Sequence, residues 1–148
     1  KIIETNTATN MYEYPSKKFS AEFLGRINII DGTSSVIDNK MIFDSYAFGK
    51  INLKRNIKLP KNGLLGIRPE KIIIDTETNK HRNRVGMNGV ITNWTYYGDI
   101  SYITIELKNK TKFYINVQNI HRNSLQELNL GKKLSASFDI NDLIILEK

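Results

Sequence analysis

The chain has 148 residues and no cysteine, which excludes disulfide bonds, thiolate metal sites and cysteine nucleophiles. Hydrophobic residues make up 40% of it and charged residues 25%, a composition that predicts a packed core and excludes wholesale disorder. The net charge of +7 suits an anionic partner such as nucleic acid, but the basic residues are scattered and form no dedicated tail.

The first 25 residues predict a helical lead-in. Thr7 suits the N-cap of a first short helix, and Pro15 ends that helix. A second helical pattern follows, and Gly25 suits the position just past its end. The start lacks the basic and apolar regions of a signal peptide, and it begins with lysine rather than methionine, so we expect a fragment of a longer protein. No apolar run approaches the roughly 20 residues of a membrane span.

From residue 26 onward, short apolar runs separated by Gly, Asn, Asp and Pro predict strands. Residues 26–75 form a first group, and the polar stretch 76–86 reads as a loop or linker. Residues 87–148 form a second group with the clearest alternation, in "SYITIEL" and "KFYINV", which the short "KNKT" joins as a hairpin. Ser124 and Glu127 have the spacing of a capping box for one helical turn. The pattern predicts an all-β fold of small antiparallel barrels or a sandwich. Strands of one group can also pair with strands of the other.

Motifs for catalysis or cofactor binding are missing from the sequence. It contains no glycine-rich phosphate loop and no nucleophile elbow. His81 and His121 have no partner at metal-ligand spacing, so surface histidines are the favoured interpretation. Asp139, Asp142 and Glu106 are interpreted as solvated strand ends. We therefore expect no catalytic, cofactor-binding or metal-binding residue here.

Two features have competing interpretations. Arg68 and Glu70 flank Pro69 at the mouth of an apolar strand. On an extended chain the two charged side chains project to one side, and they form either a structural clip between sub-barrels or a contact with another subunit. The aromatic residues of "NWTYYGDISY" either stack nucleic-acid bases or fill a barrel and cover its mouth. We favour the second interpretation because the basic residues are not concentrated beside them.

Four stretches, in order, resemble one family. "ATNMYEYPSKKFSAEFLGRIN" is similar to the segment that follows the nucleotide-binding domain in ABC importer ATPases. "GLLGIRPEKIII" resembles the family's R-P-E stretch, "GVITNWTYYGDISYITIEL" resembles the strands and Y-x-G turn of its TOBE module, and "NLGKKLSASFDINDLIIL" resembles its closing strands. The positions that match in the first stretch are Tyr12, Pro15, Phe19, Ala21, Phe23, Leu24, Gly25 and Asn28. "FLGRIN" is most similar to the polyamine-importer branch.

The resemblance implies OB-like (TOBE) small barrels after short N-terminal helices: a lead-in at 1–25, a first sub-barrel at 26–75 and a TOBE sub-barrel at 87–148. It implies a regulatory and dimerisation domain of a spermidine/putrescine importer ATPase. ATP and Mg²⁺ are expected only in the missing ATPase domain, since no Walker motif is present. The candidate interface or structural residues are Arg68, Pro69, Glu70, Gly25, Asn28, Tyr97, Gly98 and Asp99.

The resemblance also implies partners and location. We expect a homodimer, permease subunits contacted through the ATPase domain, no nucleic acid, and a place on the cytoplasmic face of the plasma membrane, with only indirect membrane contact. The alternative is an oxyanion-sensing TOBE domain of an iron, sugar or sulfate/molybdate importer, and a nucleic-acid-binding OB domain ranks below that.

Overall fold

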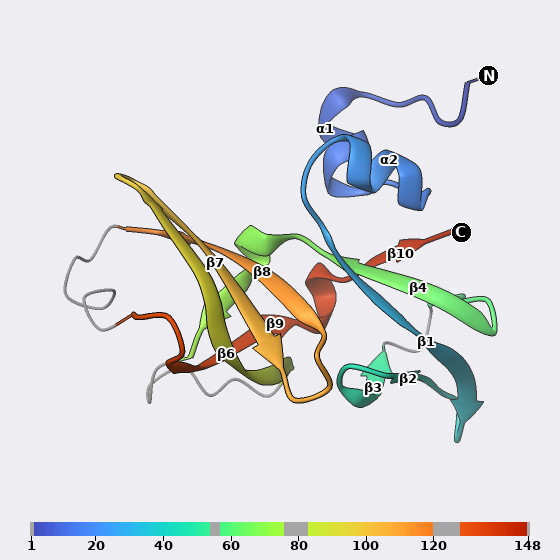
Figure 1. Ribbon diagram of the computed structural model, residues 1–148. Helices are drawn as coiled ribbons and strands as arrows, with labels where there is room; N and C mark the ends of the chain where they lie inside the picture. The colour runs from blue at the N-terminus through green and yellow to red at the C-terminus, as the bar shows by residue number, and fades with distance from the viewer. Residues whose placement is uncertain (1, 54–56, 76–82, 120–127, 148) are drawn as a thin grey trace. The chain divides into compact units, whose positions relative to one another are not determined.

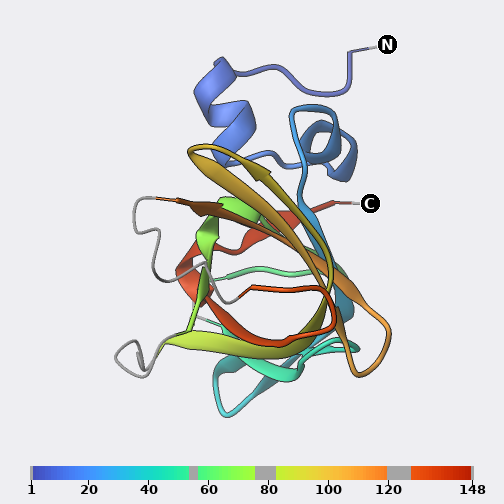
Figure 2. The ribbon, with the colours of Figure 1, turned by 60° about the vertical axis from the view of Figure 1, so that its left-hand side comes forward.

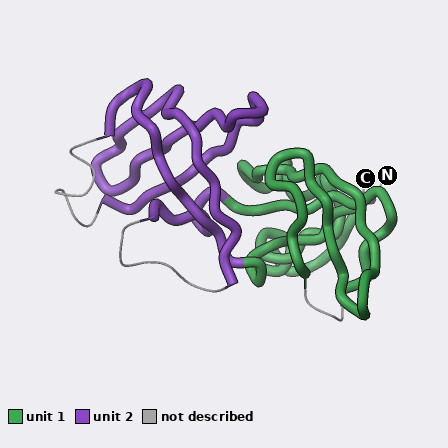
Figure 3. Tube along the Cα trace, turned by 90° about the horizontal axis from the view of Figure 1, so that it is seen from below, with its two compact units in different colours: residues 1–68, 140–148 green, residues 69–139 purple. Residues whose placement is uncertain are grey.

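The protein is described by a computed structural model that covers residues 2–53, 57–75, 83–119 and 128–147. It divides into two compact units, coloured separately in Figure 3. Unit 1 consists of Lys1–Arg68 together with Ile140–Lys148, and unit 2 consists of Pro69–Asp139. Within the described ranges, no helix is long and apolar enough to cross a membrane.

The lead-in of unit 1 contains the two short helices expected from the sequence. Helix α1 spans Ala8–Glu13, and the Thr7 hydroxyl accepts a hydrogen bond from the Asn10 amide, which confirms the predicted N-cap. Helix α2 spans Lys18–Phe23 and buries Ser20 and Ala21. Ala21 packs α2 on the sheet of its unit, while Phe19 and Phe23 of the same helix stay exposed.

Unit 1 is built on one antiparallel sheet with the strand order β10-β4-β1-β2-β3 (Figure 1). Asp38 and Asn39 both have positive φ in the tight turn that joins the first two strands in sequence, as a type I′ hairpin requires. The strands are β1 (Asn28–Ile37), β2 (Lys40–Ser45), β3 (Gly49–Leu53), β4 (Asn62–Ile67) and β10 (Ile144–Leu146). The short helix η2 (Ile140–Asp142) precedes β10.

Unit 2 is built on a second antiparallel sheet with the order β5-β9-β6-β7-β8. The two edge strands, β5 and β8, also contact each other, and the 3-10 helix η1 (Pro69–Lys71) contacts β8, so this sheet curls toward a closed barrel. Its strands are β5 (Ile72–Ile74), β6 (Arg84–Tyr97), β7 (Ile100–Leu107), β8 (Lys112–Gln118) and β9 (Lys133–Asp139). Alternate residues of β7 and the first two such residues of β8, Phe113 and Ile115, are buried as the period-two pattern predicts, whereas Val117 is half-buried.

The all-β fold class with short N-terminal helices is confirmed. Each sheet consists of strands of one unit only, although the chain returns to unit 1 at its end. The boundaries differ from those expected. Unit 2 begins at Pro69 rather than near residue 87, because β5 pairs with β9. The end of the chain leaves the second group and pairs with β4. Strand β6 begins inside the expected linker. Residues 76–82 and 120–127, which include the expected capping box, lie outside the described residues.

Candidate functional site

The Arg68 guanidinium is the centre of the best-defined polar cluster in unit 1. Its Nη1 donates hydrogen bonds to three backbone carbonyls, those of Ala21 (2.9 Å), Gly25 (3.2 Å) and Arg26 (3.3 Å). Its Nη2 donates to the Tyr12 carbonyl at 2.9 Å. The planar fork of an arginine can reach several acceptors at once, which a lysine ammonium cannot do in the same geometry. Arg68 therefore ties both lead-in helices and the turn after them to the end of β4.

The buried cation of this cluster is the Arg68 guanidinium itself, and none of the hydrogen-bond partners described for it is a carboxylate. Arg68 is only 2% exposed. Its guanidinium carbon lies 4.1 Å from the centre of the Tyr12 ring, a cation–π distance. The carbonyls of Ala21 and Gly25 are at the end of α2, where backbone acceptors lack partners within the helix. The positive charge is thus compensated by oriented carbonyl dipoles and an aromatic face.

Two of the candidate residues, Arg68 and Gly25, meet at this cluster, and a third, Asn28, bonds to the residue that precedes Arg68. Gly25 has φ of +155°, and a Cβ there would lie 3.2 Å from the Tyr12 ring. Asn28 is buried, and its side-chain amide donates to the Ile67 carbonyl at 3.3 Å. Gly25 therefore belongs to the turn that presents carbonyls to Arg68, while Asn28 fastens the start of β1 to the end of β4.

The expected common projection of Arg68 and Glu70 is wrong. The chain enters the 3-10 helix η1 at Pro69, so it is not extended through this stretch. Arg68 is buried and bonded within unit 1, Pro69 is buried, and Glu70 is exposed. The turn separates the two charged side chains because a 3-10 turn rotates successive residues about its axis. A charge reversal at Arg68 consequently tests the integrity of the lead-in and not an interface.

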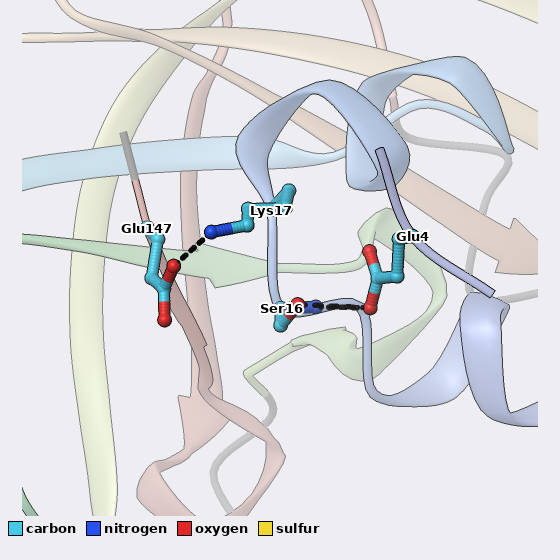
Figure 4. A network of polar contacts seen from close by, with 4 residues as sticks. All are labelled: Glu4, Ser16, Lys17 and Glu147. Carbon is cyan, nitrogen blue, oxygen red and sulfur yellow. Dashed lines mark hydrogen bonds and ion pairs between the residues drawn. The ribbon is translucent and has the colours of Figure 1, made fainter. Parts of the chain in front are cut away.

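A second set of contacts fastens the lead-in to the last strand of the chain (Figure 4). The Glu147 amide donates to the Ser16 carbonyl at 2.8 Å, and the Lys18 amide donates to the Glu147 carbonyl at 3.0 Å. The Lys17 ammonium and the Glu147 carboxylate form an ion pair. The lead-in thereby forms an isolated parallel bridge between Lys17 and Glu147, the residue that follows β10.

Glu4 adds an acidic anchor to the same region. Its Oε1 accepts hydrogen bonds from the Ser16 amide at 3.0 Å and the Ser16 hydroxyl at 2.9 Å. The Ser20 side chain, followed by the Ser16 backbone, lowers the pKa of Glu4 below its usual value of 4.5. The anchor is therefore formed by the ionised carboxylate, since each of these donors favours the charged form.

Tyr97, Gly98 and Asp99, the remaining candidate residues, form the tip of the β6–β7 hairpin in unit 2. Gly98 has φ of +67°, which the two-residue turn requires. The Asn119 side chain donates to the Gly98 carbonyl at 3.0 Å, and the Asn119 amide donates to the Asp99 carbonyl at 2.7 Å. Tyr97 packs edge-to-face on Tyr102, with ring centroids 5.6 Å apart. This tip is a separate feature that shares no described contact with the arginine cluster.

Sequence reasoning missed Asn119, Ser16 and Glu147 as fastening residues. Each acts mainly through the backbone or across a long sequence separation, so no local pattern marks it. Tyr12 was marked in the sequence as a position that matches the family pattern, but its cation–π contact with Arg68 was not predicted. Among the described residues, no group of three or more His, Asp or Glu side chains is arranged to hold a metal ion.

Two five-stranded antiparallel sheets, one in each unit, define an all-β protein of OB-like fold. Molybdate-binding protein ModG, in its crystal structure with molybdate bound, has a similar fold, with a TM-score of 0.65 over 80% of this chain and 94% of that chain at 15% identity. The sequence profile of the TOBE domain matches residues 65–146, more than half of the chain. The chain belongs to the TOBE domain family.

Two curated relatives match almost the whole chain, and a third matches four fifths of it. Spermidine/putrescine import ATP-binding protein PotA of Pseudomonas aeruginosa is 22% identical over 97% of this chain and 41% of that protein. Putrescine transport ATP-binding protein PotG of Escherichia coli is 23% identical over 99% of this chain and 40% of that protein. PotA of Fusobacterium nucleatum is 30% identical over 80% and 34%. The chain spans about two fifths of the length of the first relatives that it matches.

Proposed function

We propose that this chain is the regulatory and dimerisation domain of the ATP-binding subunit of an ABC importer of the spermidine/putrescine type. The supporting observation is that polyamine import ATP-binding proteins match it over 97–99% of its length, lead-in included. The subunit would act at the cytoplasmic face of the membrane with permease partners. ATP hydrolysis would belong to a domain outside this chain, which carries no phosphate-binding loop.

The hydrogen bonds of Arg68 support a further part of this proposal, which concerns how a movement of the ATPase domain would reach this chain. The lead-in is the segment that resembles the exit from an ATPase domain. Arg68 bonds to both lead-in helices and holds them on the sheet of unit 1. A movement of that ATPase domain would therefore move unit 1 with it, which a flexible linker would not do. Two such units in a dimer would then have different contacts in the open and closed states, and this difference would bias the transport cycle.

A chimera tests the importer role. The chain is fused to the ATP-binding part of the F. nucleatum PotA in place of the region that it matches, and spermidine uptake is measured in cells lacking their own ATPase subunit. We expect uptake well above that of the same protein truncated before the chain. A chimera that is expressed and hydrolyses ATP, yet supports no more uptake than the truncated protein, would contradict the proposal.

Dimerisation is tested on the chain itself. Sedimentation velocity across a concentration series should reveal a monomer–dimer equilibrium. A chain that stays strictly monomeric at the highest concentration would refute the dimerisation part and leave the importer assignment to the chimera.

Oxyanion sensing is the second candidate. The net charge of +7 suits an anion and repels a polycation such as spermidine, and the chain shares its fold with a protein solved with molybdate bound. Calorimetry with molybdate, sulfate and spermidine separates the cases. Heat with an oxyanion alone supports a sensor, and no heat with any of the three ligands rejects it.

A further inference from the structure

We propose that two copies of this chain pair through the outer edge of β6 at residues 93–97, as antiparallel strands related by a two-fold axis at Thr95. The inference rests on the proposed dimerisation and names its surface. It starts from a mismatch in length. Strand β6 pairs with β7 up to Tyr97, but its pairing with β9 ends at Val90. One residue further, the Ile91 amide donates to the Lys132 carbonyl and the Ile91 carbonyl accepts from the Gly131 amide. Figures 1 and 2 show the β6–β7 ribbon extending past β9.

The direction of the backbone groups follows from the hairpin. Tyr97 and Ile100 flank a two-residue turn and form a hydrogen-bonded pair, so Thr95 and Asn93 also direct their backbone groups toward β7. The Asp99 carbonyl faces β8, where it accepts from Asn119, which agrees with this alternation. The N–H and C=O groups of the residues between, Trp94 and Tyr96, therefore point away from β7.

No neighbouring strand covers these outward groups among the described residues. The β-bulge lies between Ile91 and Asn93, so it stands at the inner end of the open edge and leaves residues 93–97 regular. Such an edge is a template for an added strand unless charges, proline or bulges block it.

The composition of the edge favours a second copy over a charged partner. Residues 89–98, "GVITNWTYYG", contain no charged side chain, although the chain carries a net charge of +7. Two copies can therefore approach along this strip without facing like charges across it. Natural edges usually carry lysine or proline to prevent such pairing, and this one carries neither.

The register follows from the alternation. If Thr95 lies on the axis, Trp94 of each copy exchanges backbone hydrogen bonds with Tyr96 of the other. The indole and phenol rings then lie opposite each other on one face, an aromatic cross-strand pair. Tyr96 is 55% exposed in the single chain, so it has surface to bury. Thr95 meets its own copy as a non-hydrogen-bonded pair, with Cα atoms about 4.5 Å apart.

A pair of short strands buries less than a typical stable interface, so the contact is weak in free solution and strengthens when two subunits are already held together. Covalent trapping suits such a contact, and the chain offers it because it has no cysteine of its own. Thr95→Cys places two thiols within the Cα range of about 4.4–6.8 Å that a disulfide accepts.

Asn93→Cys is the matched control. Asn93 is exposed on the same strand and the same face as Thr95. In the proposed register, however, the two Asn93 positions are four residues apart along the strands, or about 13 Å. We expect Thr95→Cys to form a disulfide dimer under mild oxidation at least tenfold faster than Asn93→Cys. Equal rates would indicate random collision and overturn the proposal.

Tyr96→Pro supplies the second arm. Proline removes only the outward N–H of residue 96, so the β6–β7 pairing persists while the added strand is blocked. In the Thr95→Cys background it should reduce cross-linking at least tenfold, with an unchanged far-UV circular dichroism spectrum and unchanged protection of the β7 and β8 amides as evidence that the unit is folded. Undiminished cross-linking in the folded variant would refute the edge pairing. A chain that dimerises in sedimentation while Thr95→Cys fails to cross-link would refute this surface alone and keep the proposed dimerisation. A chain that neither sediments as a dimer nor cross-links would refute both.

Discussion

Replacement of Arg68 by alanine should release the lead-in from unit 1. The change removes four donor bonds and the cation–π contact with Tyr12. The bond to Ala21 is buried and contributes about 1.5–3 kcal/mol as a bond to a charged donor, while each part-buried bond contributes roughly 0.5–1 kcal/mol. The expected loss is about 3–6 kcal/mol. That is a large share of the roughly 5–15 kcal/mol of a typical domain.

The assay should read the lead-in directly. Hydrogen exchange of the Met11, Tyr14 and Leu24 amides is suitable, because each is bonded within its own short helix. In the Arg68→Ala variant these amides should exchange at least a hundredfold faster, since short isolated helices are marginal in water. Trp94 is the only tryptophan and belongs to unit 2, so its fluorescence should respond less than the exchange of the lead-in.

Arg68→Lys is the matched variant. It keeps the charge but loses the planar fork that reaches Tyr12 and Ala21 together, so we expect an intermediate loss of stability. If Arg68→Ala left the exchange rates of the lead-in amides unchanged, or cost less than about 1 kcal/mol in urea unfolding, the reasoning about the clip would be refuted.

Two further predictions concern the same region. Gly25→Ala should destabilise the chain by about 1 kcal/mol or more, because φ of +155° is strained for alanine and its Cβ would contact the Tyr12 ring. Gly86→Ala is the control, since a Cβ at Gly86 would meet open space, and it should leave the free energy of unfolding almost unchanged. Equal losses of stability in the two variants would contradict this account. Because the folded pKa of Glu4 is lowered, its anchor should be intact above pH 4.5 and be lost as the pH falls through the folded pKa. The Ser16 amide shift should follow this titration, Glu4→Gln should abolish it, and a shift that persists in Glu4→Gln would assign it to another group.

The sequence predicted the elements that depend on local chemistry. Thr7 caps α1 because its hydroxyl can reach an amide three residues on, and the "KNKT" turn joins β7 to β8 because alternation stops and restarts around it. Burial on alternate positions of β7 follows from the same period. These features need only residues a few positions apart.

The arginine cluster could not be predicted in the same way. Arg68 finds Tyr12 and Ala21 across separations of 56 and 47 residues. The direction in which the Arg68 side chain points depends on whether the chain stays extended at Pro69 or begins a turn there, and proline is compatible with both conformations. The family pattern marked Tyr12, Gly25 and the R-P-E stretch as a set, but only coordinates reveal that they meet.

The order of folding follows from where the partners of the lead-in lie. Unit 2 is inserted between Arg68 and Ile140, so β10 pairs with β4 only after the chain has passed through all of unit 2. The lead-in needs Arg68 at one side and Glu147 at the other, the latter 130 residues from its ion-pair partner Lys17. Contacts of such long separation carry a large loop-closure cost and tend to form late. The lead-in can therefore dock fully only when both parts of unit 1, before and after the insertion, are in place.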